Sequence, residues 1–127
     1  MSRRKILCVD FDGVLHSYTS GWKGPRCIPD KPVDGALSWL DHVLSHWASP
    51  FEVHIFSSRS SYWGARRAMK NWLIDWGMSP EKVARIKFPR SKPPAHLTID
   101  DRAIQFTGLF PKITSMLAFE PYREAPV

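Results

Sequence analysis

Two pairs of acidic residues in this chain have the spacing of a cation-binding or proton-sharing site. Asp10 and Asp12 directly follow a short apolar run, and Asp100 and Asp101 end a second run much later in the sequence. Close carboxylates repel each other and raise each other's pKa unless a cation or a shared proton lies between them. Oxygen ligands of this kind suit Mg²⁺. A solvated turn is the simpler alternative, because Asp and Gly are common in turns.

Side chains that can donate hydrogen bonds to phosphate oxygens follow another apolar run. Ser57, Ser58 and Arg59 stand at its end, where a hydroxyl supplies one O–H and a guanidinium supplies a bidentate fork. A basic, proline-rich loop later in the chain supplies Lys92, and Lys87 precedes it. Either ammonium group is suited to neutralise carboxylates or phosphate oxygens, and the sequence leaves the choice between them open.

The apolar runs that position these residues are typical of β-strands. We expect five strands, at residues 5–9, 51–57, 82–88, 96–101 and 113–119. Amphipathic spacing predicts one helix over residues 33–49 and another from residue 60 or 61 to residue 76. This alternation favours an α/β fold with a doubly wound, Rossmann-like parallel sheet of five strands and helices on both faces. The carboxyl ends of such strands meet at one edge, so the polar groups above should converge there.

The length of 127 residues predicts one domain, residues 1–127, without room for a large cap domain. Segment 15–32 is rich in Gly, Pro and aromatic residues and lacks a regular period, so we expect a loop that forms a flap over the site. The alternative is that Trp22 only attaches this loop to the core. This loop would offer these side chains to a substrate: His16, Tyr18, Trp22, Lys23 and Arg26. At the other end of the chain, residues 120–127 are predicted to form a loosely ordered tail.

The formal net charge of +6 favours an anionic partner and weak nucleic-acid binding. The two cysteines, Cys8 and Cys27, lack the spacing of a metal or redox motif and fit a reducing compartment. The apolar stretch after the basic start is too short for a signal peptide or a membrane span. We therefore expect a cytoplasmic protein that does not associate with a membrane.

Four short motifs, in their order along the chain, resemble those of the haloacid dehalogenase-like phosphatase superfamily. They are DFDGVL, the Ser that ends VHIFS, the Lys of SKP, and IDD, and together they span about residues 5–101. The resemblance implies a Mg²⁺-dependent phosphatase that hydrolyses phosphoesters through an aspartyl-phosphate. Relatives that cleave carbon–halogen bonds lack an acid at the position of Asp12, so its presence disfavours dehalogenation.

The resemblance also implies a role for each acidic residue. Asp10 would attack the phosphoryl group, and Asp12 would protonate the leaving oxygen and then activate water. Mg²⁺ would be held by the Asp10 side chain, the backbone carbonyl of Asp12 and the side chain of Asp100, with Asp101 close by. Which of Asp100 and Asp101 binds the metal directly is left open.

The second and third motifs supply the expected phosphate-binding residues. Ser57 matches the second motif, and Lys92 is preferred over Lys87 for the third because it lies just before the HLTIDD unit. The run SSR, followed later by IDDR, is similar to the phosphatase part of phage-type polynucleotide kinase–phosphatases, where the Arg after the second motif is functional; Arg59 matches it. Nucleic-acid end phosphates, nucleotides and sugar phosphates all remain candidate substrates.

Three other classes of protein also cluster acidic residues on an α/β fold. A metal-dependent nuclease would use two metal ions and would not need the Ser and Lys at the strand ends. A phospho-receiver domain places its acidic pair, acceptor Asp, hydroxyl and Lys in a different chain order. A catalytically inactive module that binds phosphate or nucleic acid would keep the same fold. An enzyme is favoured because every catalytic residue type is present.

Overall fold

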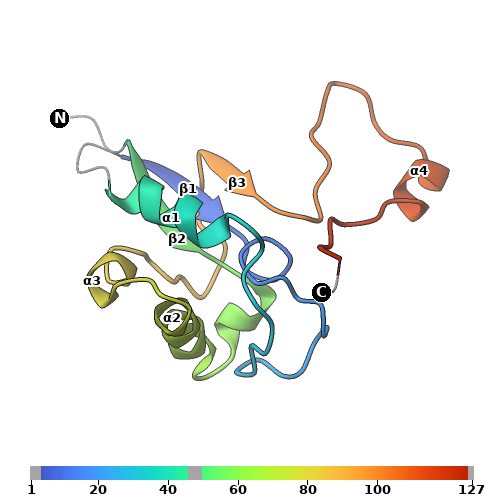
Figure 1. Ribbon diagram of the computed structural model, residues 1–127. Coiled ribbons are helices and arrows are strands. Elements are labelled where there is room, and N and C mark those ends of the chain that lie inside the picture. Colours follow the sequence, from blue (N-terminus) through green and yellow to red (C-terminus); the bar gives the residue numbers. More distant parts are fainter. Residues whose placement is uncertain (1–3, 46–49, 126–127) are drawn as a thin grey trace.

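The computed structural model describes residues 4–45 and 50–125 (Figure 1). It is a mixed α/β structure built on a small parallel sheet. In chain order the elements are β1 (Lys5–Val9), α1 (Ala36–Ser45), β2 (Phe51–Ile55), a 3₁₀ helix η1 (Ser58–Ser61), α2 (Ala65–Asp75), α3 (Pro80–Val83), β3 (Leu97–Ile99) and α4 (Ile113–Leu117).

The sheet aligns the carboxyl ends of its three strands. The strand order is β2-β1-β3, and both pairings are parallel. Val9, the last residue of β1, is in register with Ile55 of β2 and Ile99 of β3, which are also the last residues of their strands. The residues that follow the three strands therefore begin at the same edge of the sheet.

Apolar side chains from the strands and the longer helices form one core. Leu7 and Val9 of β1 pack with Ile55 of β2, and Leu40 of α1 and Leu73 of α2 belong to the same cluster. The carboxyl ends of β1 and β2 are the most buried parts of these strands, since the last three residues of each are all buried, whereas the end of β3 is only half-buried. The polar residues just beyond the strands therefore start from a rigid base.

The predicted strand at residues 82–88 is wrong for most of its length. Ser79 caps α3 by accepting a hydrogen bond from the Lys82 N–H, and Pro80 occupies the first turn, two features that favour a helix start. One residue of this segment, Lys87, pairs with β2 through an isolated bridge, donating to the Val53 carbonyl and accepting from the Ile55 N–H. The segment adds a single bridge to the sheet instead of a strand.

The predicted strand at residues 113–119 is also wrong, because α4 lies there. The N–H of Met116 donates to the Lys112 carbonyl and that of Ala118 to the Thr114 carbonyl, which is the helical pattern. A short apolar run satisfies either period, so pattern alone does not separate the two states. The sheet of the described residues thus has three strands instead of five.

Both predicted long helices exist with shorter bounds. The helix predicted over 33–49 is observed as α1, and residues 46–49 lie outside the described part of the chain. The helix predicted from residue 60 or 61 is divided into η1 and α2. Gly64 separates them with a φ of 78°, a left-handed conformation that interrupts helical geometry.

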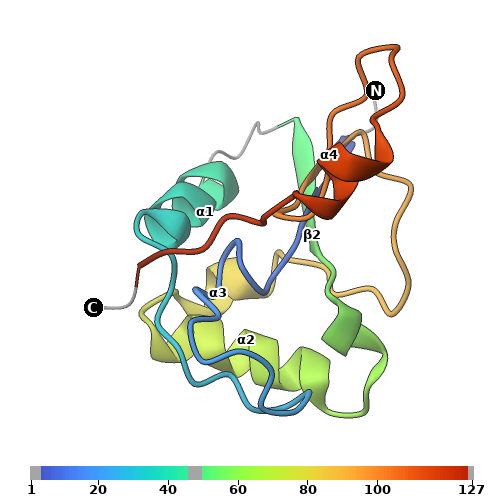
Figure 2. The same ribbon diagram turned by 90° about the vertical axis from the view of Figure 1, so that its right-hand side faces the viewer.

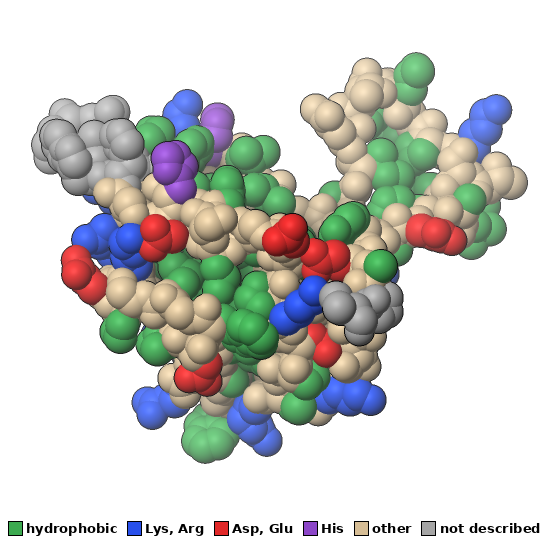
Figure 3. Space-filling view, viewed as in Figure 1, with side chains coloured by type: hydrophobic (Ala, Val, Ile, Leu, Met, Phe, Trp, Pro, Cys, Tyr) green, Lys and Arg blue, Asp and Glu red, His purple; other side chains and the backbone are tan. Residues whose placement is uncertain are grey.

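Residues 102–120, which include α4, form an arm in which every residue is exposed. Figure 1 shows this arm extending from the end of β3 away from the other helices, and in Figure 2 the arm lies in front of the domain. Apolar side chains gather on it in the space-filling view (Figure 3), and among them Phe110 and Leu117 are more than four-fifths exposed. The chain then returns to the domain, where Arg123 pairs with Asp101 and Glu124 accepts a hydrogen bond from the Asp34 N–H.

Candidate functional site

The carboxyl edge of the sheet carries a pocket of about 480 Å³. Asp10 follows β1 and is held in line with the sheet by a 2.9 Å hydrogen bond from its N–H to the Ile99 carbonyl of β3. Parallel strands in register thereby bring together residues far apart in the sequence. Of the eight predicted site residues, seven line this pocket: Asp10, Asp12, Ser57, Ser58, Lys92, Asp100 and Asp101.

Three of the acidic residues form a cluster that fits a divalent cation. Asp10, Asp100 and Asp101 each offer a carboxylate oxygen, and these oxygens lie within 4.8 Å of one another. The Oδ1 atom of Asp101 is buried and has no hydrogen-bond partner among the described residues. A buried acceptor without a partner is costly, and a cation at this position would satisfy it. The donor set, all carboxylate oxygens, is one that suits Mg²⁺.

The pKa values of Asp10 and Asp101 shift in opposite directions. The pKa of Asp10 is raised to about 8 because the carboxyl is buried, because the carboxyl of Asp101 lies within hydrogen-bond reach, and because Asp100 adds negative charge. Burial, the largest single influence, would raise the pKa of Asp101, but the hydrogen bonds from Arg123 and Asp10 and the positive charge of Arg123 together lower it. Without a cation, the raised pKa therefore favours the protonated form of Asp10.

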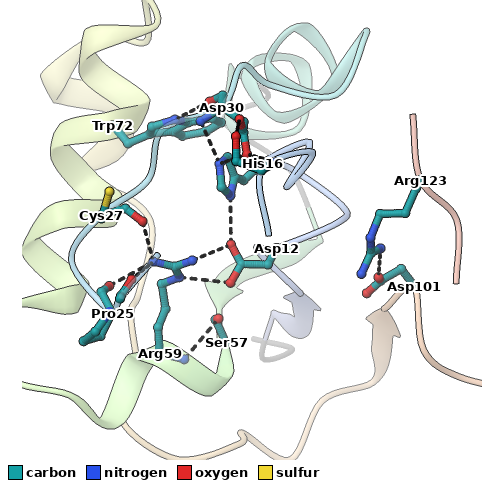
Figure 4. A network of polar contacts seen from close by, with 12 residues as sticks. Asp12, His16, Pro25, Cys27, Asp30, Ser57, Arg59, Trp72, Asp101 and Arg123 are labelled. Carbon is teal, nitrogen blue, oxygen red and sulfur yellow. Dashed lines mark hydrogen bonds and ion pairs between the residues drawn. The ribbon is translucent and has the colours of Figure 1, made fainter. Parts of the chain in front are cut away.

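Asp12 belongs to a different network from the other carboxylates. Arg59 donates to it twice, from Nε to Oδ2 at 3.0 Å and from Nη2 to Oδ1 at 2.9 Å. His16 donates from Nδ1 to Oδ1 at 2.9 Å. Figure 4 shows this network on one side of Asp12 and the contact between Arg123 and Asp101 on the other. The carboxylate of Asp12 is therefore held in one orientation beside the acidic cluster of Asp10, Asp100 and Asp101.

Arg59 occupies a place other than the one expected for a phosphate-binding residue. Its side chain is fully buried and does not line the pocket. Besides its two bonds to Asp12, its Nη1 donates to the carbonyls of Gly24, Pro25 and Cys27. With these acceptors in place the guanidinium does not face a bound phosphate, so its contacts are those of a residue that positions Asp12.

His16 is a site residue whose role the sequence reasoning missed. Its Nε2 accepts a 3.1 Å hydrogen bond from the backbone N–H of Asp30, so the ring proton lies on Nδ1, which faces Asp12. The ring is fully buried and stacks on Phe11, with Trp72 at its edge. The only signal in the sequence is a histidine four residues after Asp12, which is weak because many residue pairs have this spacing.

Ser57 presents a buried hydroxyl to the pocket. Its Oγ accepts a 3.2 Å hydrogen bond from the Arg59 N–H, and its own N–H donates to the Ser60 Oγ at 2.9 Å. This capping box starts η1 and holds the serine backbone in place. Ser58, the next residue, is exposed and also lines the pocket. The pair can donate O–H groups to an anion bound there.

The geometry distinguishes between the two candidate lysines. Lys92 lines the pocket with the acidic cluster. Lys87 does not; its Nζ pairs with the Glu52 carboxylate at 2.6 Å, near the start of β2. Lys92 is therefore the lysine that can reach a phosphate in the pocket.

Arg102 and Arg123 also line the pocket and were missed. Arg123 pairs with Asp101, and its guanidinium lies 5.4 Å from the ring centre of Tyr18. Its position depends on the chain returning from the exposed arm, which no local pattern reveals. The arginine places a positive charge next to the acidic cluster.

Gly13 is needed where the chain passes the acidic cluster. It has a φ of 85°, which only glycine adopts without strain. A Cβ atom at this position would also overlap the carboxylate of Asp101 and the guanidinium of Arg123. The glycine thus lets the backbone after Asp12 approach both side chains.

Part of the loop at residues 15–32 lies against Arg59. Its carbonyl groups accept the Arg59 bonds, and the Trp22 ring centre lies 5.0 Å from the guanidinium carbon. Of the five side chains that the loop was expected to offer, Tyr18 lines the pocket and the others do not. The loop is attached to α2 by a 3.0 Å hydrogen bond from Trp72 Nε1 to the Asp30 carbonyl.

Comparisons with known proteins were made on this sequence. No model of a protein family and no curated protein matches the chain. Among the described residues, no helix has the length and apolar character needed to cross a membrane.

Proposed function

We propose that this protein is a Mg²⁺-dependent phosphatase that works through an aspartyl-phosphate, on a doubly wound, Rossmann-like fold of the haloacid dehalogenase type. One observation carries the proposal. A cluster of carboxylates with a buried, unpartnered oxygen on Asp101 shares one pocket with a serine hydroxyl and a lysine. A cation site beside phosphate-oxygen donors is what phosphoryl transfer requires.

The residues divide the chemistry between them. A carboxylate oxygen of Asp10 forms a bond to phosphorus while the bond from phosphorus to the leaving oxygen breaks. Asp12 begins this step protonated, gives its proton to the leaving oxygen and becomes the carboxylate that Arg59 and His16 contact. Water, deprotonated by Asp12, then attacks phosphorus, which releases phosphate and restores Asp10. Ser57 and Lys92 hold the phosphoryl oxygens. Bound Mg²⁺ would supply charge neutralisation between the nucleophile and the phosphoryl group.

Asp10 is suited to the role of nucleophile by its position. It lies at the end of the central strand, its backbone N–H is bonded to β3, and its carboxyl lies in the metal-binding cluster. In the metal-free protein its pKa is raised by burial and by the other carboxyl groups. A bound cation would remove this effect and leave Asp10 as the carboxylate that the reaction needs.

The deciding experiment is phosphate release from a panel of phosphomonoesters, with Mg²⁺ and with chelator. The panel includes nucleotides, sugar phosphates and oligonucleotides phosphorylated at either end. We expect release that requires Mg²⁺ and that falls at least 10³-fold in Asp10→Asn, which is nearly isosteric. Asp41→Asn is the matched control, because this carboxylate pairs with Lys82 outside the pocket.

A trapped intermediate separates the phosphatase from a metal-dependent nuclease. Acid-quenched wild-type protein should carry phosphate on Asp10 that hydroxylamine releases, since acyl phosphates react with this nucleophile. Cleavage of internal phosphodiester bonds without such an intermediate would support the nuclease. Absence of turnover on every substrate would support an inactive phosphate-binding module.

A further inference from the structure

A second and larger groove, of about 1030 Å³, runs along α2 toward α3. The charged residues that line it are Arg66, Arg67, Lys70 and Arg90. Among the described residues, none that lines the groove is acidic. A groove lined by charges of one sign raises the local concentration of an oppositely charged ligand, so this groove attracts polyanions.

The positive charges of the groove are not neutralised by acidic side chains of the described residues. None of the four is in an ion pair within the described part of the chain, whereas Lys82 and Arg85 of the neighbouring segment pair with Asp41 and Glu81. Two groove residues are held by uncharged partners. Arg66 donates from Nη1 to the Phe88 carbonyl at 3.1 Å, and the Lys70 Nζ lies 5.3 Å from the ring centre of Phe88.

Two aromatic side chains, just before the N-terminus of α2, line one part of the groove. Trp63 is 87% exposed and Tyr62 is 52% exposed. The Trp63 carbonyl accepts a 3.1 Å hydrogen bond from Arg26, which attaches its backbone to the loop. Tyr62 lies 6.2 Å from Trp22, centre to centre. An exposed indole on a fixed backbone beside a row of cations is suited to stacking a flat, uncharged ring.

We propose that this groove binds single-stranded nucleic acid. Backbone phosphates would pair with the cations along α2, and a base would stack on Trp63. A ligand that uses both features must carry phosphates for the cations and flat rings for Trp63. Single-stranded nucleic acid has both, whereas other polyanions lack the rings. Single strands are favoured over duplex because bases in a duplex are already stacked on each other.

Two short segments of the chain line both the groove and the acidic pocket. The helix η1 contributes Ser58 to the pocket and Ser61 to the groove, and the loop after Phe88 contributes Lys92 to the pocket and Arg90 to the groove. Three residues of 3₁₀ helix span about 6 Å. A strand in the groove can therefore place its terminal phosphate at Asp10; this last step rests on the proposed phosphatase function, whereas binding in the groove does not.

Fluorescence anisotropy with a labelled single-stranded 12-mer that lacks a terminal phosphate tests the proposal independently of catalysis. We expect Arg67→Ala/Lys70→Ala to weaken binding at least tenfold and to reduce its dependence on salt. Trp63→Ala should weaken binding about fivefold without changing the salt dependence. Lys112→Ala, which removes one exposed cation from the arm, is the control and should change affinity less than twofold.

Each other outcome overturns the proposal. Equal losses in the groove variants and in the control would indicate attraction by net charge alone. An unchanged affinity in Trp63→Ala, together with equally tight binding of inorganic polyphosphate, would indicate a general polyanion surface. The thermal midpoint of each variant shows whether it is folded. If the 12-mer binds as expected but no phosphomonoester is hydrolysed, the groove stands and the phosphatase function does not.

Discussion

The guanidinium of Arg59 and the carboxylate of Asp12 form a two-bond ion pair, at 3.0 and 2.9 Å, in which the arginine is fully buried. The pair joins the segment after β1 to η1, two parts of the chain that meet only through the fold. Removing one partner of a buried pair leaves the other charge uncompensated. The ion pair therefore links the stability of the domain to the orientation of a proposed catalytic residue.

We expect Arg59→Ala to lower the free energy of unfolding by about 3 kcal/mol, measured by urea denaturation. Arg59→Lys keeps the charge but not the planar fork, so it should restore only part of the loss. Arg67→Ala, at an exposed position of α2, is the control and should change stability by less than about 0.5 kcal/mol. A loss below about 1 kcal/mol in Arg59→Ala would show that the pair contributes little in solution.

The metal-free protein should become less stable as the pH rises from 5 to 8. The pKa of Asp10 is about 8 in the folded protein and 3.8 in the reference state. The unfolded chain has already lost this proton at pH 5, whereas the folded chain keeps it until the pH approaches 8, so stability falls with increasing pH across this range. Thermal midpoints in chelator should show a decrease that Asp10→Asn largely removes.

Mg²⁺ should counteract this loss of stability at high pH. A cation that binds the folded state raises the thermal midpoint, and it removes the need for a proton on Asp10. We expect saturating Mg²⁺ to raise the midpoint of the wild type by several degrees at pH 8 and to have little effect on Asp100→Asn. An equal shift in both proteins would place the bound ion outside the acidic cluster.

Gly13→Ala should be destabilising for two separable reasons. The backbone at this residue is left-handed, and the added Cβ would overlap Asp101 and Arg123. Gly21→Ala is a matched control, since Gly21 has a similar φ of 72° and open space around it. We expect about 1 kcal/mol of destabilisation in the control and at least twice that in Gly13→Ala. Equal losses would mean that Asp101 and Arg123 move aside without cost.

The position of the pocket could be predicted because it depends on local rules. An apolar strand followed by Asp10, or by Ser57, places a polar residue at the carboxyl end of a parallel strand whatever the rest of the chain does. Only the parallel pairing had to be inferred. The predicted strands at residues 82–88 and 113–119 were wrong because a few apolar residues do not distinguish a strand from a short helix.

The partners of the site residues could not be predicted from pattern. Arg59 was expected at the phosphate because of its bidentate fork and its match to the second motif. An arginine after a strand end can turn either way, however, and here its direction depends on carbonyl groups supplied by residues 24–27. Arg123 reaches Asp101 only because the chain returns after the exposed arm. His16 becomes part of the site through its buried contact with Asp12. All three are tertiary contacts, and the sequence contains no periodic signal for them.

Lys92 and Lys87 provide a test of the phosphate site within one short segment. Lys92 lines the pocket, and Lys87 makes an exposed ion pair with Glu52. We expect Lys92→Ala to lower kcat/KM at least 50-fold in a phosphate-release assay, because an ammonium group beside the phosphoryl oxygens is lost. Lys87→Ala should change kcat/KM less than twofold and stability by less than about 1 kcal/mol, since exposed ion pairs contribute little. The reverse pattern would assign the third motif to Lys87 and would require its ion pair with Glu52 to open during catalysis.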